Sequence, residues 1–323
     1  MRRAWIPALL VCVVAVVVTA QGGQVEFPGK GQPVSLIIPW AAGGGTDIGG
    51  RIIAAGLEKE LGNPVQVINK PGASGQLGMT ELAQARPDGH TIAYSALSSV
   101  VMNYTDPGRK ATFQRKDLSA VAAHVADVRA VAVSVKSPYR SAKDLADAIT
   151  ATPGKVKAAT VGALSDAHFA ELWFEKLTGG QFTYVHYKGT GEAIPALIGG
   201  HVDVYFGATS ELHPLVKGGE FRVLAILGTK ESPFLPGVRT MEAQGYPIFY
   251  TTYRNFYAPG GTPKEIIDTL SKALMRVMES AEHRKKMEGE LGIALQYQDP
   301  AEMAKAWDDM EKAMKDLIPL ARK

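Results

Sequence analysis

The chain has 323 residues, of which 46% are hydrophobic and 21% charged, which is ordinary for a globular protein long enough for about two domains. Its formal net charge is +3, and two of its 35 basic residues, Arg2 and Arg3, lie at the extreme N-terminus. Without these two, 33 basic residues face 32 acidic ones. This balance excludes the strongly basic character typical of nucleic-acid-binding proteins, and we expect no nucleic-acid partner.

Residues 1–20 have the features of a secretory signal peptide. They begin with a positive charge, continue with an apolar run over residues 6–18, and end in small residues before Ala20. The run is shorter than the ~20 residues that a membrane-spanning helix needs, so we predict cleavage after Ala20 rather than a retained anchor. The lone Cys12 lies inside the apolar run beside bulky Val11, which argues against a lipoprotein. The mature protein is expected to have no disulfide and to lie outside the cytoplasmic membrane.

Residues 34–51, VSLIIPWAAGGGTDIGGR, predict a strand, a glycine loop and the start of a helix. The apolar run over 34–38 is typical of a strand buried in a parallel sheet, and residues 21–33 before it are expected to be a tether. Three consecutive glycines then allow the backbone to approach another molecule. We expect Thr46 or Asp47 to cap a helix that continues through Leu57. Free N–H groups at a helix start favour an anion, so this loop is expected to hold a small carboxylate.

The following segments alternate strands and helices, as in a parallel α/β sheet. Strands are predicted over 64–68 and 90–94, a helix over 79–85, and a polar loop over 95–99. A strand over 156–161, a small polar loop and a helix over 166–177 then repeat the opening unit. This repetition predicts two lobes that each present a helix start to one ligand.

The rest of the pattern predicts a second sheet and two long helices. Further strands are expected over residues 128–135, 185–187, 202–206, 223–227 and 249–257, and further helices over 141–150, 192–198, 264–278 and 301–320. In the last helix, an apolar stripe is typical of core packing; it consists of Met303, Trp307, Met310, Met314 and Leu317.

The glycine loop does not match the common nucleotide-binding patterns. A dinucleotide fingerprint that used Gly43 and Gly45 would need its third glycine at the position of Ile48. The Gly-Lys-Ser/Thr sequence of a Walker loop is also missing. A tight turn without a ligand therefore remains as the alternative to a carboxylate site.

Six short segments, spread in order over nearly the whole mature chain, carry a family resemblance. They are IPWAAGG at 38–44 with Asp47 and Arg51, NKPGA at 69–73, PDGHT at 87–91, YKG at 187–189, GGHVD at 199–203 and APGGTP at 258–263. In these segments the chain resembles the extracytoplasmic solute-binding receptors of tripartite tricarboxylate transporters, the Bug family.

The resemblance implies an α/β, two-lobed type II periplasmic-binding-protein fold, with two parallel or mixed sheets flanked by helices and a hinge between the lobes. Lobe 1 would combine residues 34–123 with 246–323, and lobe 2 would be residues 124–245. The resemblance also implies that backbone groups and ordered water at the loop after the first strand hold the ligand carboxylate. The loop over 162–165 would face it from the other lobe.

The candidate ligand-binding residues lie in loops that follow predicted strands, where open α/β sheets bind their ligands. They are Trp40, Ala42, Gly43, Gly44, Gly45, Asp47, Ser95, Gly162, Ala163, Ser165, His168 and Thr190.

Several of these residues have a structural alternative. Asp47 either caps its helix or accepts a hydrogen bond from a ligand or a bridging water. Trp40 either offers the cleft a flat apolar wall or packs in the core. Ser165 either contacts the ligand or only caps a helix, on which His168 shares its face. Arg254 is the one cation expected near the hinge, although a surface arginine is the commoner case.

Patterns of catalysis and metal binding are absent from the sequence. No histidine pair has metal-ligand spacing, and Gly72-Ala73-Ser74-Gly75 lacks the spacing of a nucleophile elbow. We expect a non-enzymatic protein without metal or cofactor.

The expected function is capture of a small organic di- or tricarboxylate by a monomeric periplasmic receptor. The receptor would deliver it to the large and small membrane subunits of a tripartite tricarboxylate transporter. The alternative is a sensory binding protein that presents its ligand to a membrane kinase. A secreted hydrolase is disfavoured by the missing nucleophile arrangement.

Overall fold

A computed structural model describes residues 27–319. The predicted signal peptide and the first part of the tether lie outside this range. Within it, strands and helices alternate along most of the chain, as the periodicity predicts. The α/β class is therefore confirmed.

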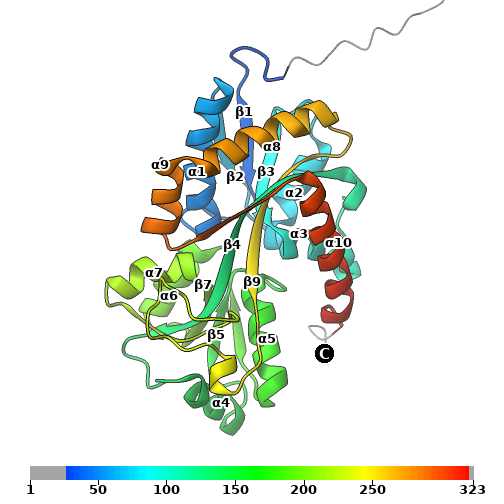
Figure 1. The fold of residues 1–323 in the computed structure, drawn as a ribbon. Helices are drawn as coiled ribbons and strands as arrows, with labels where there is room; N and C mark the ends of the chain where they lie inside the picture. The colour runs from blue at the N-terminus through cyan, green and yellow to red at the C-terminus, as the bar shows by residue number, and fades with distance from the viewer. Residues whose placement is uncertain (1–26, 320–323) are drawn as a thin grey trace, which may run out of the picture.

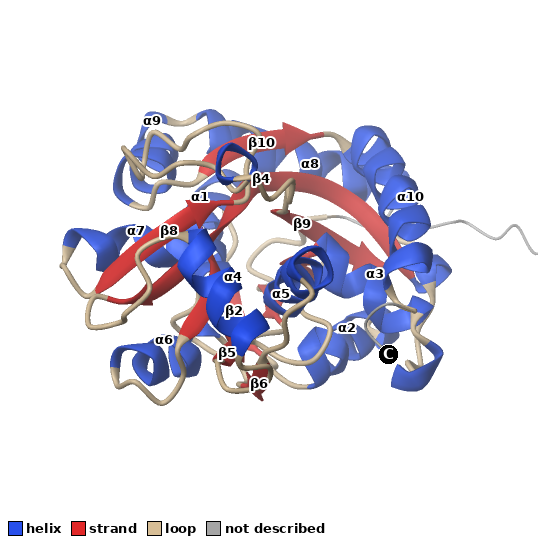
Figure 2. Ribbon diagram, turned by 90° about the horizontal axis from the view of Figure 1, so that it is seen from below, coloured by secondary structure: helices blue, strands red, loops and turns tan. Residues whose placement is uncertain are grey.

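The strands of the described chain form one continuous, curved sheet (Figure 2). Neighbouring strands follow the order β2-β1-β3-β9-β4-β7-β5-β6, and β8 and β10 also pair with β4. Their bounds are β1 Val34–Ile38, β2 Val65–Asn69, β3 Thr91–Ala96, β4 Leu118–Ser134, β5 Lys157–Thr160, β6 Thr183–His186, β7 Val204–Ala208, β8 Phe221–Ile226, β9 Thr251–Pro259 and β10 Ala294–Gln298.

Strand β4 joins two halves of this sheet. Its first part pairs antiparallel with β9, from Leu118 to Val128, in the half that also contains parallel β1, β2 and β3. Its last part, from Arg129, pairs antiparallel with β7 and β8, in the half that contains parallel β5, β6 and β7. Figure 1 shows β4 running from one half of the molecule into the other beside β9. The two expected sheets therefore share one long strand.

Helices cover both halves of the sheet (Figures 1 and 2). They are α1 Gly45–Leu61, α2 Gln76–Gln84, α3 Leu97–Thr105, α4 Ala142–Ala151, α5 Asp166–Thr178, α6 Thr190–Ile198, α7 Thr209–Lys217, α8 Lys264–Glu279, α9 Ala281–Arg284 and α10 Pro300–Leu317. Helices α1 and α8 approach closely at Gly56, where an added Cβ would lie 2.3 Å from Cγ1 of Val277. A residue larger than glycine would push these helices apart.

Helix α10 packs its apolar stripe into the core. Met303, Trp307 and Met314 are buried. The indole Nε1 of Trp307 donates to the hydroxyl of Tyr104 at 2.8 Å, which ties α10 to α3. The predicted core role of these three side chains is confirmed.

Two predictions about the segments that follow strands are wrong. Residues 95–99 do not form a polar loop, because β3 continues to Ala96 and α3 begins at once, with Ser98 and Ser99 buried in it. Helix α1 is not capped by Thr46 or Asp47. Gly44 is its N-cap, with extended backbone angles of φ −85° and ψ 167°, so the helix begins earlier than expected. Helix α7 and strand β10 have no counterpart among the predicted elements.

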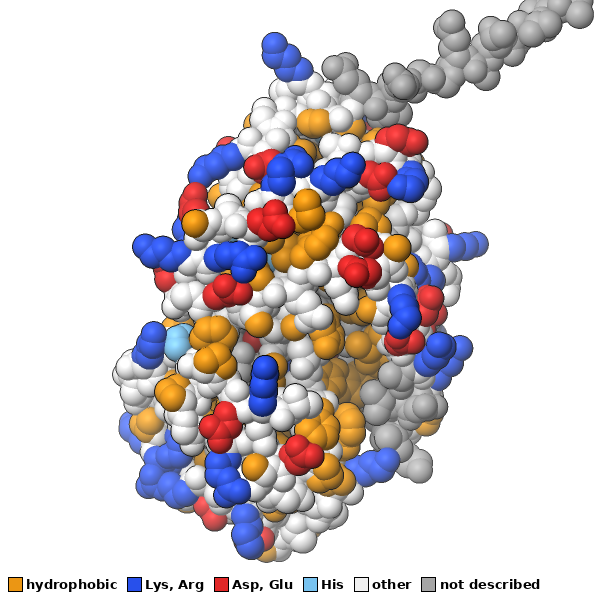
Figure 3. Space-filling view, viewed as in Figure 1, with side chains coloured by type: hydrophobic (Ala, Val, Ile, Leu, Met, Phe, Trp, Pro, Cys, Tyr) orange, Lys and Arg blue, Asp and Glu red, His pale blue; other side chains and the backbone are white. Residues whose placement is uncertain are grey.

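The surface carries charges of both signs. On the face seen in Figure 3, Lys and Arg side chains are interspersed with Asp and Glu. Among residues 27–319, no helix combines the length and the apolar character that crossing a membrane requires.

Candidate functional site

Two neighbouring cavities lie between the halves of the sheet. The inner cavity has a volume of about 30 Å³, which is space for about two water molecules. The outer cavity has a volume of about 410 Å³. Trp40, which follows β1, and Val161, which follows β5, line both. The two cavities therefore adjoin each other along these side chains.

The inner cavity is surrounded by the first residues of four helices. For each helix, the wall contains the N-cap residue and a residue of the first turn: Gly44 and Gly45 at α1, Ala96 and Ser99 at α3, Ser165 and Asp166 at α5, and Gly189 and Thr190 at α6. N–H groups in the first turn of a helix have no partner within that helix and lie at the positive end of its dipole. Four helix starts around one small cavity favour a carboxylate without any excess of basic side chains.

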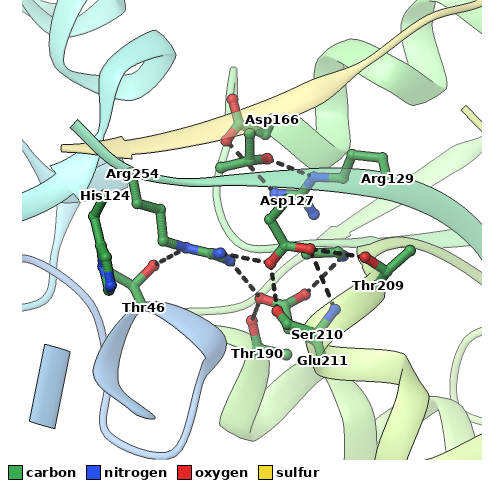
Figure 4. Close-up of polar contacts among 12 residues, drawn as sticks. Thr46, His124, Asp127, Arg129, Asp166, Thr190, Thr209, Ser210, Glu211 and Arg254 are labelled. Carbon is green, nitrogen blue, oxygen red and sulfur yellow. Dashed lines mark hydrogen bonds and ion pairs between the residues drawn. The ribbon is translucent and has the colours of Figure 1, made fainter. Parts of the chain in front are cut away.

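Arg254 of β9 is held at this cavity by three polar neighbours (Figure 4). Its Nη1 donates to Oδ2 of Asp127 at 2.5 Å and its Nε to Oγ1 of Thr46 at 3.0 Å. Its Nη2 lies 3.8 Å from Oε1 of Glu211. Thr46 belongs to α1 and Glu211 to α7, so the arginine connects elements from both halves of the sheet. The side chain is buried, and the surface alternative for Arg254 is wrong.

Arg129 of β4 forms a second buried network in the same wall. Its Nε donates to Oγ1 of Thr252 at 3.0 Å, and its Nη2 lies 3.6 Å from Oδ2 of Asp166. The hydroxyl of Tyr250 donates to Asp166 at 3.0 Å, and the hydroxyl of Ser98 also donates to it. Asp166 is thereby fixed at the start of α5.

The charged side chains in the wall of the inner cavity balance one another. Arg129 and Arg254 are matched by Asp166 and Glu211. Burial alone would lower the pKa of Arg254, but the carboxylate of Asp127 and other neighbours outweigh it, and the pKa is raised. Each arginine already has a carboxylate partner. An additional anion would depend on helix starts and uncharged donors rather than on a free cation.

Two buried polar groups of this wall have no hydrogen-bond partner among the described residues. They are the indole N–H of Trp40 and the hydroxyl of Ser165, on side chains that are 8% and 0% exposed. Ser165 occupies the N-cap position of α5, but its hydroxyl makes no capping hydrogen bond. A buried polar group without a partner costs about 1–3 kcal/mol, so both groups are suited to bind a ligand.

The structure brings most, but not all, of the predicted ligand residues to the two cavities. The inner cavity is lined by Trp40, Gly44, Gly45, Ser165 and Thr190. The outer cavity is lined by Gly162 and Ala163, together with Trp40. Neither cavity is lined by Ala42, Gly43, Asp47, Ser95 or His168.

Asp47 holds the glycine loop in position. Its Oδ2 accepts from the N–H of Gly43 at 2.9 Å, and its Oδ1 accepts from Nδ2 of Asn69 at 2.9 Å. Arg51 Nε donates to the same carboxylate at 3.0 Å. Burial opposes the charge of Asp47, but these hydrogen bonds outweigh it and lower the pKa. The carboxylate therefore fixes the loop that leads into α1.

His168 supports the loop over residues 162–165, on the opposite side of the cleft from the glycine loop. Its Nδ1 accepts from the N–H of Leu164 at 2.8 Å. Leu164 has a φ of +59°, a left-handed conformation that is strained for a bulky side chain. Burial, together with the charges of His186 and Arg109, lowers the pKa of His168 to about 4. The imidazole is therefore neutral at pH 7.

Four charged residues of these two buried networks, Asp127, Arg129, Asp166 and Glu211, are not among the predicted site residues. A signal for the first two exists in the sequence VADVRAV at 125–131, because residues two apart on a strand share a face. Opposite charges on one face of an otherwise apolar strand indicate a polar site. Glu211 carries no comparable signal, since it lies in a helix that was not predicted.

The curved α/β fold with a cleft between two halves defines a class, the two-lobed periplasmic solute-binding proteins. A family model described as the tripartite tricarboxylate transporter family receptor, TctC, matches residues 50–321, and the chain belongs to this family. The resemblance carried by the six segments is confirmed.

Relatives and solved structures agree with this assignment. The chain is 31% identical over 290 residues to the UPF0065 protein in the gbd 5′ region of Cupriavidus necator, covering 88% of this chain and 86% of that protein. It is 31% identical over 251 residues to BugT of Bordetella pertussis, covering 77% of each. A solved periplasmic transporter matches with a TM-score of 0.86 at 27% identity, over 91% of this chain and 98% of its own. MatC from Rhodopseudomonas palustris, solved with bound malate, matches with a TM-score of 0.83 at 26% identity, over 88% and 98%.

This family consists of solute-binding proteins, and the protein is accordingly a Bug-type solute-binding protein rather than an enzyme. Family membership implies an extracytoplasmic location. In the described part of the chain, no group of three or more His, Cys, Asp or Glu side chains is arranged to hold a metal ion.

Proposed function

We propose that this protein captures a small organic carboxylate in the cleft between its lobes and delivers it to the membrane subunits of a tripartite tricarboxylate transporter. One observation carries the proposal: four helix starts and the two unpartnered donors of Trp40 and Ser165 surround one cavity. The space of about 30 Å³ suits the two oxygen atoms of one carboxylate. The malate bound by MatC supports this ligand class.

Binding would draw the lobes together. Helix α1 comes from the half of the sheet assigned to lobe 1, residues 34–123 and 246–323, and α5 from the half assigned to lobe 2, residues 124–245. A carboxylate that accepts hydrogen bonds from both helix starts stabilises the closed arrangement. The lobes open to admit the ligand and close around it, which creates the surface that the transporter recognises.

The proposal includes the route to the periplasm. Residues 1–20 act as a signal peptide that is removed after Ala20, and the mature receptor works as a monomer without a lipid anchor. Mass spectrometry of the protein secreted by its own host tests the removal of the leader and the absence of a lipid. An N-terminus at Gln21 supports it, and a mass that includes the leader contradicts it.

Ligand binding is tested on the secreted protein by thermal shift and calorimetry. The compounds are mono-, di- and tricarboxylates, aromatic acids and acidic amino acids. A carboxylate present at 100 times its Kd stabilises the folded state by about 2.7 kcal/mol, which raises the melting temperature by several degrees. A melting temperature that none of these compounds changes would contradict the carboxylate proposal.

Delivery is tested separately, in vesicles that contain the two membrane subunits of the transporter. Uptake of the labelled carboxylate should require the receptor. Uptake that proceeds equally well without it would contradict the delivery step and favour a sensory role.

A further inference from the structure

We infer that Ser74 and Arg109 clasp the backbone carbonyl of Ala163 across the cleft, and that this clasp keeps the cleft closed and slows the release of its ligand. The inference rests on the proposed function, because it assigns to two side chains the control of closure over the proposed binding site. It does not depend on which carboxylate that site holds.

One carbonyl group accepts two hydrogen bonds from the other side of the cleft. The hydroxyl of Ser74 donates to the carbonyl oxygen of Ala163 at 2.8 Å, and Nη2 of Arg109 donates to the same oxygen. Ala163 follows β5, whereas Ser74 lies between β2 and α2, and Arg109 lies between α3 and β4. Both donors therefore belong to the proposed lobe 1, and the acceptor belongs to the proposed lobe 2.

The clasp lies beside the proposed ligand. Ser74, Arg109 and Ala163 all line the outer cavity, which adjoins the inner one. A movement that separates the two sides of this cavity breaks both hydrogen bonds at once. One of them comes from a charged guanidinium, which makes a stronger hydrogen bond than a neutral donor. The clasp therefore favours the closed arrangement directly, without a ligand between the two sides.

Both donors are held in position on their own side of the cleft. Nη1 of Arg109 donates to the carbonyl of Ala73 at 2.9 Å and to Oδ1 of Asn103 at 2.8 Å. Nδ2 of Asn103 donates in turn to the carbonyl of Ser74 at 3.4 Å. Asn103 belongs to α3, so this helix carries both donors as one unit. Because the donors are already ordered, closing the clasp costs little conformational entropy.

Left-handed backbone conformations are concentrated at this contact. Within residues 27–319, the residues other than glycine with a positive φ are Ala73 at +48°, Ser74 at +53°, Lys110 at +51° and Leu164 at +59°. Each of them either belongs to the clasp or directly neighbours one of its members in the sequence. Such conformations persist only where surrounding contacts hold them, and they gather at ligand clamps and switches. Their concentration here indicates a functional contact rather than an incidental one.

The clasp also positions the hydroxyl of Ser165. In the same loop, the N–H of Ser165 donates to the carbonyl of Gly162 at 3.1 Å, and the N–H of Leu164 donates to Nδ1 of His168 at 2.8 Å. With the carbonyl of Ala163 held as well, the loop keeps the Ser165 hydroxyl in the wall of the inner cavity. Loss of the clasp frees this loop, so the ligand is expected to leave faster.

Double electron–electron resonance on the ligand-free secreted protein tests closure. The only cysteine of the sequence, Cys12, lies in the predicted signal peptide, so cysteines introduced at exposed Gln84 of α2 and Lys176 of α5 carry the spin labels. We expect the distance of the closed structure to predominate in the otherwise unmodified protein. Ser74→Ala should lower the ratio of closed to open molecules about three- to tenfold. Ser74→Gly removes the same hydroxyl but tolerates the positive φ, so it gives the same readout if the alanine variant folds poorly.

Ser271→Ala is the matched control. The hydroxyl of buried Ser271 lies 2.9 Å from that of Tyr297, and both residues belong to the proposed lobe 1. This variant loses a hydrogen bond of similar length within one lobe, so the ratio of closed to open molecules should not change.

Stopped-flow kinetics test the release of the ligand. The probe is malate, which MatC binds, or the carboxylate that binds most tightly in the thermal-shift screen. Ser74→Ala should raise the dissociation rate constant about three- to tenfold and change the association rate constant less than twofold. A dissociation rate constant that stays the same would contradict the effect of the clasp on release.

The outcomes separate this inference from the proposed function. If the ligand-free protein is entirely open, or if neither variant of Ser74 changes the distances between the labels, the clasp is overturned and the carboxylate receptor is not. If no carboxylate binds in the thermal-shift screen, the proposed function is overturned, and the distances still decide whether Ser74 holds the cleft closed.

Discussion

Nη1 of Arg254 and Oδ2 of Asp127 lie 2.5 Å apart, on side chains that are both buried. Removing one partner of a buried ion pair leaves an uncompensated charge, which costs about 3–5 kcal/mol. We therefore expect Asp127→Leu to lower the free energy of unfolding by about that amount, measured by urea denaturation.

The double variant Asp127→Leu/Arg254→Met provides the control for this pair. It removes both charges, so its loss of unfolding free energy should be clearly smaller than the summed losses of Asp127→Leu and Arg254→Met made singly. Additive losses would show that the two side chains do not stabilise each other, despite their distance.

Gly44 faces Thr190 across the cleft, and an added Cβ would lie 3.4 Å from Cβ of that threonine. The branched side chain of Gly44→Val would extend further, into the space where the lobes meet. We expect affinity for the carboxylate ligand to fall at least tenfold by calorimetry. The free energy of unfolding should change by less than about 1 kcal/mol, because φ −85° and ψ 167° suit valine.

Gly289→Val is the matched control for that substitution. Gly289 is exposed, and nothing lies within 4 Å of an added Cβ. Affinity equal to that of the unmodified protein is expected. If Gly44→Val binds equally well, the start of α1 does not contact the ligand.

Ser165 and Ser141 both occupy helix N-cap positions but differ in their hydrogen bonds. The hydroxyl of Ser141 accepts from the N–H of Asp144 at 3.1 Å, whereas that of Ser165 caps nothing and lies in the wall of the inner cavity. Ser165→Ala should therefore weaken ligand binding about three- to tenfold, with stability unchanged or slightly increased. Ser141→Ala should cost about 1 kcal/mol of stability and leave affinity unchanged. If both variants lose stability and Ser165→Ala keeps its affinity for the ligand, Ser165 is a purely structural residue.

The buried imidazole of His168 makes stability depend on pH. Its pKa is about 4 in the fold and about 6.5 in an unfolded chain, so the unfolded state binds the proton first as the pH falls. This contribution is absent above pH 6.5 and destabilises the fold progressively between pH 6.5 and 4. It amounts to about 2 kcal/mol between pH 7 and pH 5.

Urea denaturation at several pH values checks this contribution. His168→Asn retains an acceptor for the N–H of Leu164 but does not titrate, so its stability should fall less between pH 7 and pH 5 than that of the unmodified protein. The stability of His201→Asn, a variant at an exposed histidine, should fall between pH 7 and pH 5 as much as that of the unmodified protein. Identical pH profiles for all three proteins would contradict the role assigned to His168.

Apolar periodicity and glycine positions in the sequence were sufficient to predict the strand–loop–helix units of the fold. The apolar run of β1, the glycines after it and the helical spacing of α1 were sufficient for the first strand–loop–helix unit. The same features at β5 and α5 predicted its partner. The prediction of a loop over residues 95–99 is wrong because Ser98 and Ser99 resemble loop residues in sequence. In the fold, both are buried in α3 beside the cleft.

The buried ion pairs could not be predicted in this way. Arg254 and Asp127 are 127 positions apart and meet only because β9 and β4 lie antiparallel in the sheet. Charge alone cannot distinguish such an arginine from a surface one. What separates them is the removal of both partners from water, a property of the assembled sheet.

Strand β4 supplies hydrogen-bonded neighbours to both halves of the sheet, so neither half has a complete sheet of its own. Cooperative unfolding follows from this arrangement. Loss of β4 from one half removes ladder partners from the other, and the protein should melt in a single transition rather than lobe by lobe. A ligand that contacts only the cleft would then protect amides throughout the chain from hydrogen exchange by global unfolding, including those far from its binding site.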